Sequence, residues 1–292
     1  MIIIKEGNKT ANAYGFGAGI AALEKGLIAI GNPDPDVIIC NDYSDSVSAI
    51  VLKEKTKYPL IASIHLFNKD NSQTKLLIDN CDGIIVYSKL AKKPIEEVYP
   101  ELKVPIKVVY YGIDTTFWGQ GEVARSNFLM FAGRTSQHSK NFFEIIKKVI
   151  EENIPFIVAG DVQYDRILGR IPCKHMSKEE LKLMYQLAKL HILPSTFEPF
   201  GLVTLEAMAC GCPVAVSTNS GVAELLNDDV AILFDPTKPF SLNDFMQRAE
   251  SFDSNKLSEF AKQFDHISYA KNFMKAVSEL TQEHFYSYYK EK

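Results

Sequence analysis

Two hydrophobic patterns alternate along this chain. Short continuous apolar runs, which are typical of buried parallel strands, occur at residues 2–4, 37–40, 60–64 and 154–161. Between the last of these and the next apolar run, residues 177–190 have the spacing of an amphipathic helix, with Ser177 as the N-cap and Glu180 closing a capping box. Residues 268–289 have a similar helical spacing. The pattern therefore predicts alternating strands and helices.

The segment 191–216 contains the densest pattern. It predicts a strand at 191–195, a loop at 196–200, a helix that begins near Gly201 and ends near Gly211, and a strand at 213–216. The helix places Glu206 on the same face as its apolar residues, whereas Glu198 precedes it in the loop. A carboxylate on an apolar face is expected to be paired or functional. A strand, loop, helix and strand in this order present groups to a ligand at the strand ends.

Both carboxylates lie near a predicted helix start. The first N–H groups of a helix have no partner within the helix, so residues 201–203 can bind phosphate. Glu198 and Glu206 can accept hydrogen bonds from hydroxyl groups. A ligand that carries phosphate groups beside hydroxyl groups is typically a nucleotide sugar, so the segment predicts a site for such a ligand. The alternative is that Glu206 bonds to a backbone amide or a lysine and Glu198 is only solvated, and the spacing leaves both interpretations open.

This segment resembles a known signature. The run E198-PFGLVTL-E206, followed by AMACGCPVAV, is similar to the Glu-x7-Glu motif of retaining glycosyltransferases of family 4, which have the GT-B fold. The run FLMFAGRTSQHSKN at 128–141 resembles the family's strand, Gly-Arg, loop and Lys, here Gly133, Arg134 and Lys140. Arginine and lysine suit that role, because they stabilise the negative charge of a departing diphosphate. Asn141 stands where the family usually has glycine.

The resemblance implies further roles. It implies that Glu198 binds the donor sugar, that Glu206 holds the ribose hydroxyls, and that His65, at the end of an apolar run, approaches the sugar. A structural role for His65 remains an equal alternative, because a histidine at a strand end is often structural. The donor site implied by the family also includes Gly17, Gly133, His175, Met176, Phe200, Gly201, Leu202, Val203 and Gly221. The base is expected to contact mainly the backbone at 175–176, so its identity cannot be predicted. No metal ligand and no cofactor beyond the donor are implied.

A second hypothesis comes from residues 17–22. They fit the G-x-G-x-x-A dinucleotide fingerprint, and Asp42 follows about twenty residues later, which indicates an NAD-dependent oxidoreductase. The fingerprint needs its glycines directly after the first strand, whereas residues 5–16 intervene here. The glycosyltransferase interpretation instead predicts a glycine-rich loop that opens a helix at 19–26. A GT-B-like protein that epimerises or only binds its sugar nucleotide is a third hypothesis.

Composition limits the classes of protein to which the chain can belong. A net charge of −4 argues against general nucleic-acid binding, and no apolar run approaches the roughly eighteen residues of a membrane span. The five cysteines are an odd number with no zinc spacing, which favours the cytoplasm. Asp34-Pro35-Asp36 is interpreted as a turn and not as a metal-binding D-x-D. Five lysines between 89 and 107 are interrupted by glutamates, so a solvated face is favoured over peripheral contact with the cytoplasmic face of a membrane.

These observations and the resemblance together predict an α/β protein with the GT-B fold, in which two Rossmann-like domains face a cleft. Residues 1–115 would form a short acceptor-side domain, residues 116–265 the nucleotide-sugar domain, and residues 266–292 a helix that returns to the first domain. The implied activity is the transfer of a hexosyl group, with retention, from a UDP- or GDP-sugar to an acceptor hydroxyl without a required metal. The acceptor class stays open between glycan, lipid, protein and small molecule.

Overall fold

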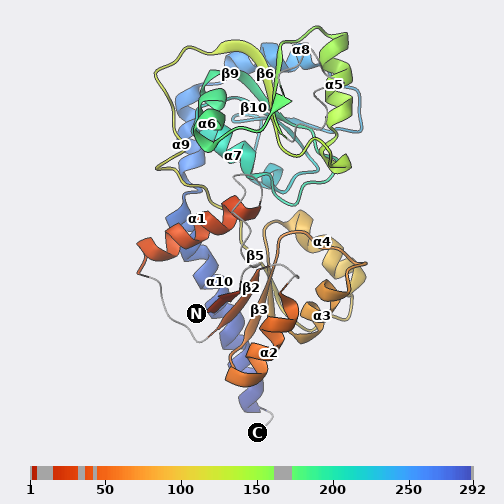
Figure 1. Ribbon diagram of the computed structural model, residues 1–292, viewed down its shortest axis with the longest axis vertical. Helices are drawn as coiled ribbons and strands as arrows, with labels where there is room; N and C mark the ends of the chain where they lie inside the picture. Colours follow the sequence, from red (N-terminus) through yellow and green to blue (C-terminus); the bar gives the residue numbers. More distant parts are fainter. Residues whose placement is uncertain (1, 5–15, 32–36, 42–44, 161–172, 291–292) are drawn as a thin grey trace. The chain divides into compact units, whose positions relative to one another are not determined.

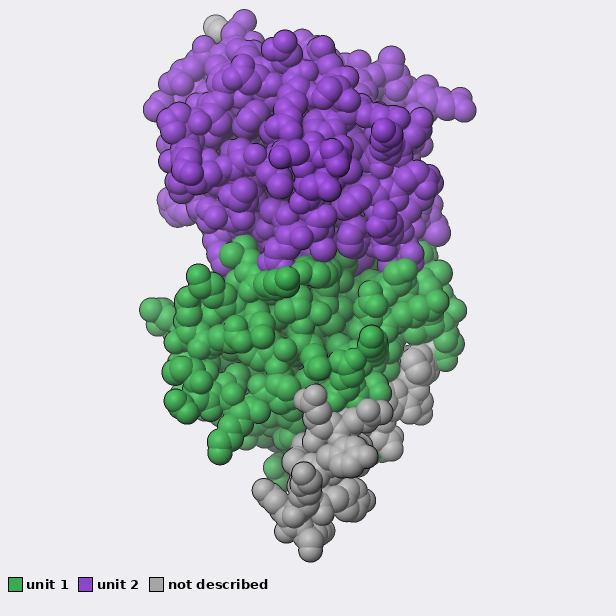
Figure 2. Space-filling model, turned by 180° about the vertical axis from the view of Figure 1, so that it is seen from behind, with its two compact units in different colours: residues 1–11, 20–111, 266–292 green, residues 12–19, 112–265 purple. Residues whose placement is uncertain are grey.

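The computed structural model describes residues 2–4, 16–31, 37–41, 45–160 and 173–290 (Figure 1). The chain divides into two compact units, drawn in separate colours in Figure 2. Unit 1 comprises residues 1–11, 20–111 and 266–292, and unit 2 comprises residues 12–19 and 112–265. The domain boundaries expected from the sequence, at 115/116 and 265/266, stay a prediction.

Unit 1 is built on a parallel sheet whose strand order follows the chain, β1-β2-β3-β4-β5. The strands are β1 (Ile2–Ile4), β2 (Ile38–Asn41), β3 (Leu60–Ile64), β4 (Gly83–Val86) and β5 (Ile106–Val108). The helices are α1 (Phe16–Ala29), whose residues from Ile20 on belong to this unit, α2 (Ser46–Thr56), α3 (Ser72–Asn80), α4 (Lys89–Val98) and α10 (His266–Lys290). Every residue of β2, β3 and β4 is buried, which explains why these strands read as continuous apolar runs.

The last helix, α10, belongs to unit 1 although it follows unit 2 in the chain. It packs closely on two glycines of this unit: a Cβ at Gly26 of α1 would lie 2.7 Å from Cβ of Ala270, and one at Gly83 of β4 would lie 3.0 Å from Cδ2 of Leu280. Side chains at these two positions would therefore keep α10 away from the unit. This placement agrees with the predicted return of the C-terminal helix.

Unit 2 contains a six-stranded parallel sheet of order β11-β10-β9-β6-β7-β8. Its strands are β6 (Ser126–Ala132), β7 (Phe156–Ala159), β8 (Cys173–Lys174), β9 (Ala188–Leu193), β10 (Val214–Ser217) and β11 (Ile232–Phe234). The chain first adds β7 and β8 on one side of β6 and then β9, β10 and β11 on the other. Ligands of doubly wound sheets bind at the carboxyl ends of the strands where the order reverses, which here lies between β6 and β9.

The helices of unit 2 connect these strands. They are η1 (His138–Lys140), α5 (Phe142–Glu151), α6 (Lys178–Leu187), α7 (Leu202–Ala209), η3 (Gly221–Leu225), α8 (Leu242–Arg248), η4 (Ala249–Ser251) and α9 (Ser254–Lys262). The capping box predicted for Ser177 and Glu180 is present, since the Ser177 side chain accepts from the Glu180 amide and the Glu180 side chain accepts from the Ser177 amide. All eight residues of α7 are buried, so this helix crosses the interior of the unit.

The predicted start of the first helix is wrong. α1 begins at Phe16, not at Gly19, so Gly17 and Gly19 are helical residues and not part of a glycine-rich loop. The four residues that follow Gly19, at 20–23, are all apolar. The packing of these residues outweighs the low helix propensity of glycine. Asp42 of the dinucleotide fingerprint and the Asp34-Pro35-Asp36 turn lie outside the described residues.

Two further expectations concern the membrane and the cysteines. None of the described helices combines the length and the apolar character that a membrane span requires. Cys40, Cys81, Cys210 and Cys212 are buried and are not joined in disulfides. Burial raises the pKa of Cys81, Cys210 and Cys212 to about 12, so these three thiols stay protonated and pack as small apolar groups.

Candidate active site

The residues predicted from the donor-site motif follow the carboxyl ends of four strands of unit 2. Gly133 and Arg134 follow β6, His175 and Met176 follow β8, the loop with Glu198 follows β9, and Gly221 follows β10. Because all pairs of strands in this sheet are parallel, these loops lie at one edge. β6 and β9, which flank the reversal of strand order, carry the two loops with the most charged candidates.

Lys140 and Glu198 form an ion pair between these two central loops. Nζ of Lys140 contacts Oε2 of Glu198, and the two side chains are only 15% and 14% exposed. The backbone holds the same loops together, because the Thr196 amide donates to the Ser139 carbonyl at 2.8 Å. Two residues that are 58 positions apart in the sequence thus meet at the carboxyl edge of the sheet.

Two residues near Lys140, Gly133 and Asn141, have unusual backbone conformations. Gly133 has φ +152°, and a Cβ there would lie 3.8 Å from Cε of Lys140, so the strand end passes close to the lysine side chain. Asn141 has φ 55°, in the left-handed region, directly before α5. Asparagine tolerates this conformation better than most residues, which explains how it stands where the family usually has glycine. Arg134 is exposed in the same loop.

Gly201 sets the start of α7. Its φ is +105°, and a Cβ there would lie 2.6 Å from Cδ2 of Leu193 and 3.4 Å from Cγ of Glu198. Only glycine fits this turn without displacing the end of β9 or the loop carboxylate. Leu202 and Val203 then occupy the first helical positions, whose N–H groups have no partner within the helix. Phe200, on the other side of the glycine, is buried.

Glu206 is buried within α7, as its position on the apolar face predicted. It is 3% exposed, and desolvation raises its pKa to about 8, opposed by the charge of Lys178 at the start of α6. No hydrogen bond or ion pair of its carboxyl group with another described residue is found, and its oxygens are not among the fully buried polar atoms that lack a partner. The alternative in which a lysine or a backbone amide of the described chain holds Glu206 is therefore not observed. A buried carboxyl without a partner is costly, and a ligand that donates hydroxyls would offset that cost.

Met176 and His175 differ in exposure. Met176 is buried at 2% exposure, whereas the side chain of His175 is exposed, and both lie between β8 and the N-cap of α6. That the backbone at these two residues contacts a base stays a prediction.

The backbone amides at 221–222 are not free donors. The Gly221 amide donates to the Glu198 carbonyl at 2.9 Å, and the Val222 amide donates to the Phe200 carbonyl at 2.8 Å. The start of η3 thus uses both amides to hold the Glu198 loop. A site role for Gly221 through its close backbone approach stays a prediction.

His65 lies in unit 1, directly after β3, within an aromatic cluster. Its Nδ1 hydrogen-bonds the hydroxyl of Tyr111, its Nε2 lies 3.5 Å from Oγ of Ser63, and its ring stacks on Tyr87 with a centroid distance of 4.7 Å. Burial lowers the pKa of His65 to about 3, so the imidazole is neutral at physiological pH. The packing accounts for a structural role. Nε2, whose contact is the longer one, is the atom that the predicted contact with a sugar would use.

Sequence reasoning missed Arg125. Its guanidinium donates to the carbonyls of Tyr185, Gln186 and Ala188, at 2.9–3.2 Å, at the end of α6. It also reaches the carbonyl of Cys210, at the end of α7, at 3.4 Å. One side chain therefore joins the carboxyl ends of the two helices that border the candidate site. An arginine in a polar linker gives no signal of this role, because the helices it joins lie 60 or more residues away.

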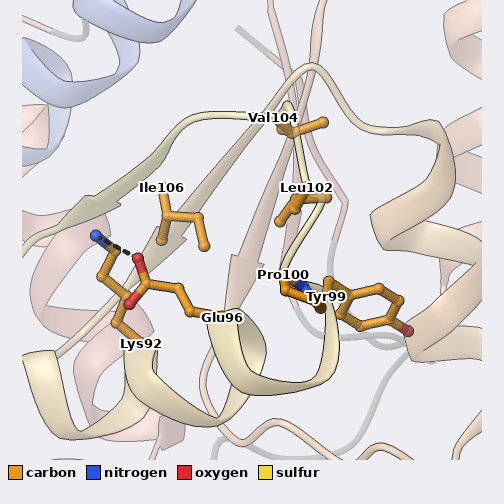
Figure 3. A pocket seen from close by; sticks show the side chains of 7 residues that line it. All are labelled: Lys92, Glu96, Tyr99, Pro100, Leu102, Val104 and Ile106. Carbon is orange, nitrogen blue, oxygen red and sulfur yellow. Dashed lines mark ion pairs between the residues drawn. The ribbon is translucent and has the colours of Figure 1, made fainter.

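A separate cavity of about 220 Å³ lies in unit 1 (Figure 3). Tyr99, Leu102, Val104 and Ile106 form its apolar wall, and the Lys92–Glu96 ion pair, at 2.9 Å, lies at one side. It is lined by residues that precede or begin β5, at the edge of the sheet opposite to the strand ends where ligands of such folds bind. Lys93 and Lys107 are also paired, with Glu97 and Glu279, which favours a mixed-charge face.

Comparison with known proteins gives the class. A sequence model of the family "Glycosyl transferases group 1" matches residues 113–267, more than half of the chain, and the chain belongs to this family. An uncharacterised glycosyltransferase of Methanocaldococcus jannaschii is 26% identical over 264 residues, which cover 75% of this chain and 67% of that protein. A glycogen synthase of Mycobacterium tuberculosis is 24% identical over 65% of this chain and 54% of its own length. The chain thus spans about half to two thirds of the length of these relatives.

Solved structures confirm the GT-B fold. Anabaena HepE in complex with UDP-glucose matches with a TM-score of 0.68 and 20% identity, over 88% of this chain and 82% of that one. AviGT4, a glycosyltransferase involved in avilamycin A biosynthesis, matches with a TM-score of 0.68 and 17% identity, over 92% and 91%. Two parallel α/β units are what this fold requires. Membership of the family does not favour the oxidoreductase hypothesis.

Proposed function

We propose that this protein is a retaining glycosyltransferase of family 4, with the Glu-x7-Glu motif at Glu198 and Glu206, that transfers a hexosyl group from a UDP- or GDP-sugar to an acceptor hydroxyl. One observation carries the proposal. Lys140 and Glu198 form a largely buried ion pair at the carboxyl edge of the sheet, the Glu198 loop leads into the amino end of α7, and Glu206 is buried about one turn further along this helix.

The cationic groups suit a departing diphosphate. When the bond between the anomeric carbon and the phosphate oxygen breaks, the diphosphate gains negative charge. Lys140 and Arg134 would stabilise that charge, and the amides of Leu202 and Val203 would add hydrogen bonds at the helix start. Because two side-chain cations serve the leaving group, we propose that turnover does not require a divalent metal or another cofactor. The amides at Gly17, in the first turn of α1, would serve the same anion.

The two carboxylates would bind hydroxyls. Glu206, which is buried, would hold the ribose, and Glu198 would hold hydroxyls of the donor sugar and orient its anomeric carbon. The backbone at His175 and Met176, with Phe200 nearby in the motif, would contact the base. The contact of His65 with the donor sugar stays a prediction from the family resemblance.

No described side chain is placed as a covalent nucleophile in this assignment, so we propose transfer on one face. The acceptor oxygen bonds to the anomeric carbon from the side that the diphosphate leaves, and the hydroxyl proton passes to the departing phosphate oxygen. The configuration is thereby retained. We place the reaction in the cytoplasm, with a glycan, lipid, protein or small molecule as acceptor and with peripheral contact at the cytoplasmic membrane face as a lesser alternative.

The relatives support the donor class. Anabaena HepE has been solved with UDP and with UDP-glucose, and its fold matches that of this chain. We extend the donor class, and not the particular sugar, to this protein. The first experiment is a thermal-shift panel with UDP, GDP, ADP, their common sugar conjugates and NAD(H). A ligand that binds only the folded state, at a hundred times its dissociation constant, adds ~2.7 kcal/mol to the free energy of unfolding.

The outcomes separate the hypotheses. A higher melting temperature with one nucleoside diphosphate and its sugar conjugate supports the transferase and identifies the base. A higher melting temperature with NAD(H) alone contradicts it and supports the oxidoreductase. Incubation with the donor then distinguishes transfer, which needs an acceptor, from epimerisation, which changes the sugar without one. NMR of the product determines whether the anomeric configuration is retained.

A further inference from the structure

Lys140, the cation proposed to bind the diphosphate, is already engaged by a carboxylate in this structure. Its ammonium group is paired with the Glu198 carboxylate, and both side chains are about six-sevenths buried. The Thr196–Ser139 hydrogen bond and the Gly221–Glu198 hydrogen bond fix the backbones that carry the pair. Separating a largely buried ion pair is costly because it leaves each charge without compensation, so a ligand must compete with Glu198 for the lysine.

The competition differs between a sugar nucleotide and a bare nucleoside diphosphate. Any ligand that draws Lys140 to its phosphates leaves Glu198 without its cation in a half-buried loop. A sugar nucleotide brings hydroxyl groups that can donate hydrogen bonds to Glu198. A bare diphosphate brings only acceptor oxygens and one further negative charge near the carboxylate, so Glu198 is left unsatisfied and repelled.

We infer that Glu198 makes the site select the sugar nucleotide over the bare nucleoside diphosphate, by holding Lys140 until donor hydroxyls replace it. This inference rests on the proposed function. The same competition acts after transfer. Once the sugar has left with the acceptor, Glu198 loses its hydroxyl partners and recovers Lys140, which weakens the hold on the diphosphate and favours its release.

The test is the affinity of UDP, GDP, UDP-glucose and GDP-mannose for the full chain, measured by calorimetry for wild type, Glu198→Gln, Lys140→Met and the double variant. Glu198→Gln keeps the shape but removes the charge, so Lys140 is released. We expect the bare diphosphate to bind about tenfold more tightly to Glu198→Gln than to wild type, since the lysine no longer has to leave a charged partner. The sugar nucleotide should gain less or lose affinity, because its hydroxyls lose the carboxylate.

Two controls isolate the pair. Glu151→Gln removes the same charge from the exposed end of α5 and should leave all affinities unchanged. In the Lys140→Met background, Glu198→Gln should no longer tighten the binding of the bare diphosphate. Equal or weaker binding of the bare diphosphate by Glu198→Gln, or a gain that persists without Lys140, overturns the inference.

A ligand-free measurement separates this inference from the proposed function. The rate of acetylation of Lys140 by acetic anhydride, followed by mass spectrometry, should rise several-fold in Glu198→Gln, whereas exposed Lys147 should react equally in both proteins. If wild type binds a nucleotide and the selectivity does not change, only this inference fails. If no nucleotide binds to any variant, both the inference and the proposed function fail. An unchanged acetylation rate would show that the pair does not shield Lys140 and would also overturn the inference.

Discussion

The burial of Glu206 predicts a specific dependence of stability on pH. Its pKa is raised to about 8 by desolvation, above the 4.5 of the exposed group, so the folded protein holds a proton that the unfolded chain releases in this interval. Stability that comes from the protonated carboxyl is therefore present below pH 4.5 and is lost as the pH rises through about 8. Glu206→Gln replaces the protonated carboxyl by a neutral group of the same shape, and it should not show this loss.

The size of the change in the free energy of unfolding follows from the interval between the pKa of Glu206 in the unfolded and in the folded protein. Between pH 5 and pH 9 the free energy of unfolding of wild type should fall, relative to Glu206→Gln, by ~4 kcal/mol, at 1.36 kcal/mol for each pH unit below the folded pKa. The difference between the two proteins isolates this carboxyl, because their other titrating groups are the same. At pH 5 the two should have similar stability.

The assay can be confined to unit 2. Trp118 is the single tryptophan of the chain, is 5% exposed and packs against Tyr185 at 5.9 Å, so its fluorescence reports unfolding of the unit that contains Glu206. Urea titrations at pH 5, 7 and 9 for wild type and Glu206→Gln provide the difference, with Glu151→Gln as an exposed control. A difference that does not change with pH, or one that favours wild type at high pH, would refute the buried neutral carboxyl. Nucleotide affinity should also fall in Glu206→Gln if the carboxylate binds the ribose.

Substitutions at four positions test the remaining geometry. Lys140→Ala should lower turnover with the donor by two orders of magnitude or more, at ~3 kcal/mol for a charge-stabilising group, and near-normal turnover would remove its assigned role. Gly201→Ala should lower the melting temperature, since φ +105° and a Cβ at 2.6 Å from Leu193 cost ~1–3 kcal/mol; an unchanged melting temperature would contradict this turn. Asn141→Ala should lose ~1 kcal/mol at its left-handed φ whereas Asn141→Gly should not, and equal losses would count against backbone strain. Burial lowers the pKa of His65 to about 3, so the stability that the neutral imidazole provides is present above pH 6.5 and is lost as the pH falls toward 3. The melting temperature of His65→Phe should therefore fall less between pH 7 and pH 5 than that of wild type. An equal fall in both proteins would argue that the imidazole is not held neutral.

Local features of the fold could be predicted because their causes lie within a few residues. The capping box at Ser177 and Glu180, the helix start at Gly201 and the burial of Glu206 each depend on spacing along one element. The start of the first helix could not be predicted in this way. Gly17 and Gly19 are typical of a loop, whereas the helix in fact begins at Phe16, before both glycines.

The candidate site could be predicted only in part, because its decisive contacts are long-range. The pairing of Lys140 with Glu198 depends on β6 and β9 being neighbours, which no local pattern encodes. The use of the Gly221 amide by the Glu198 carbonyl was also unexpected, since a glycine-rich turn gives no sign of which carbonyl it will meet. Arg125 was missed for the same reason.

The hydrogen bonds of Arg125 to the ends of α6 and α7 have a thermodynamic consequence for ligand binding. Its planar guanidinium donates to carbonyls at the ends of both α6 and α7, so one side chain ties the ends of these two helices together. α6 follows the His175–Met176 backbone and α7 carries Glu206. The walls that would receive a base and a ribose are thus ordered before any ligand arrives, and the conformational entropy of arranging them is not lost on binding. Binding should therefore have a small entropic penalty from the protein, and loosening Arg125 should increase that penalty without altering any atom that touches the ligand.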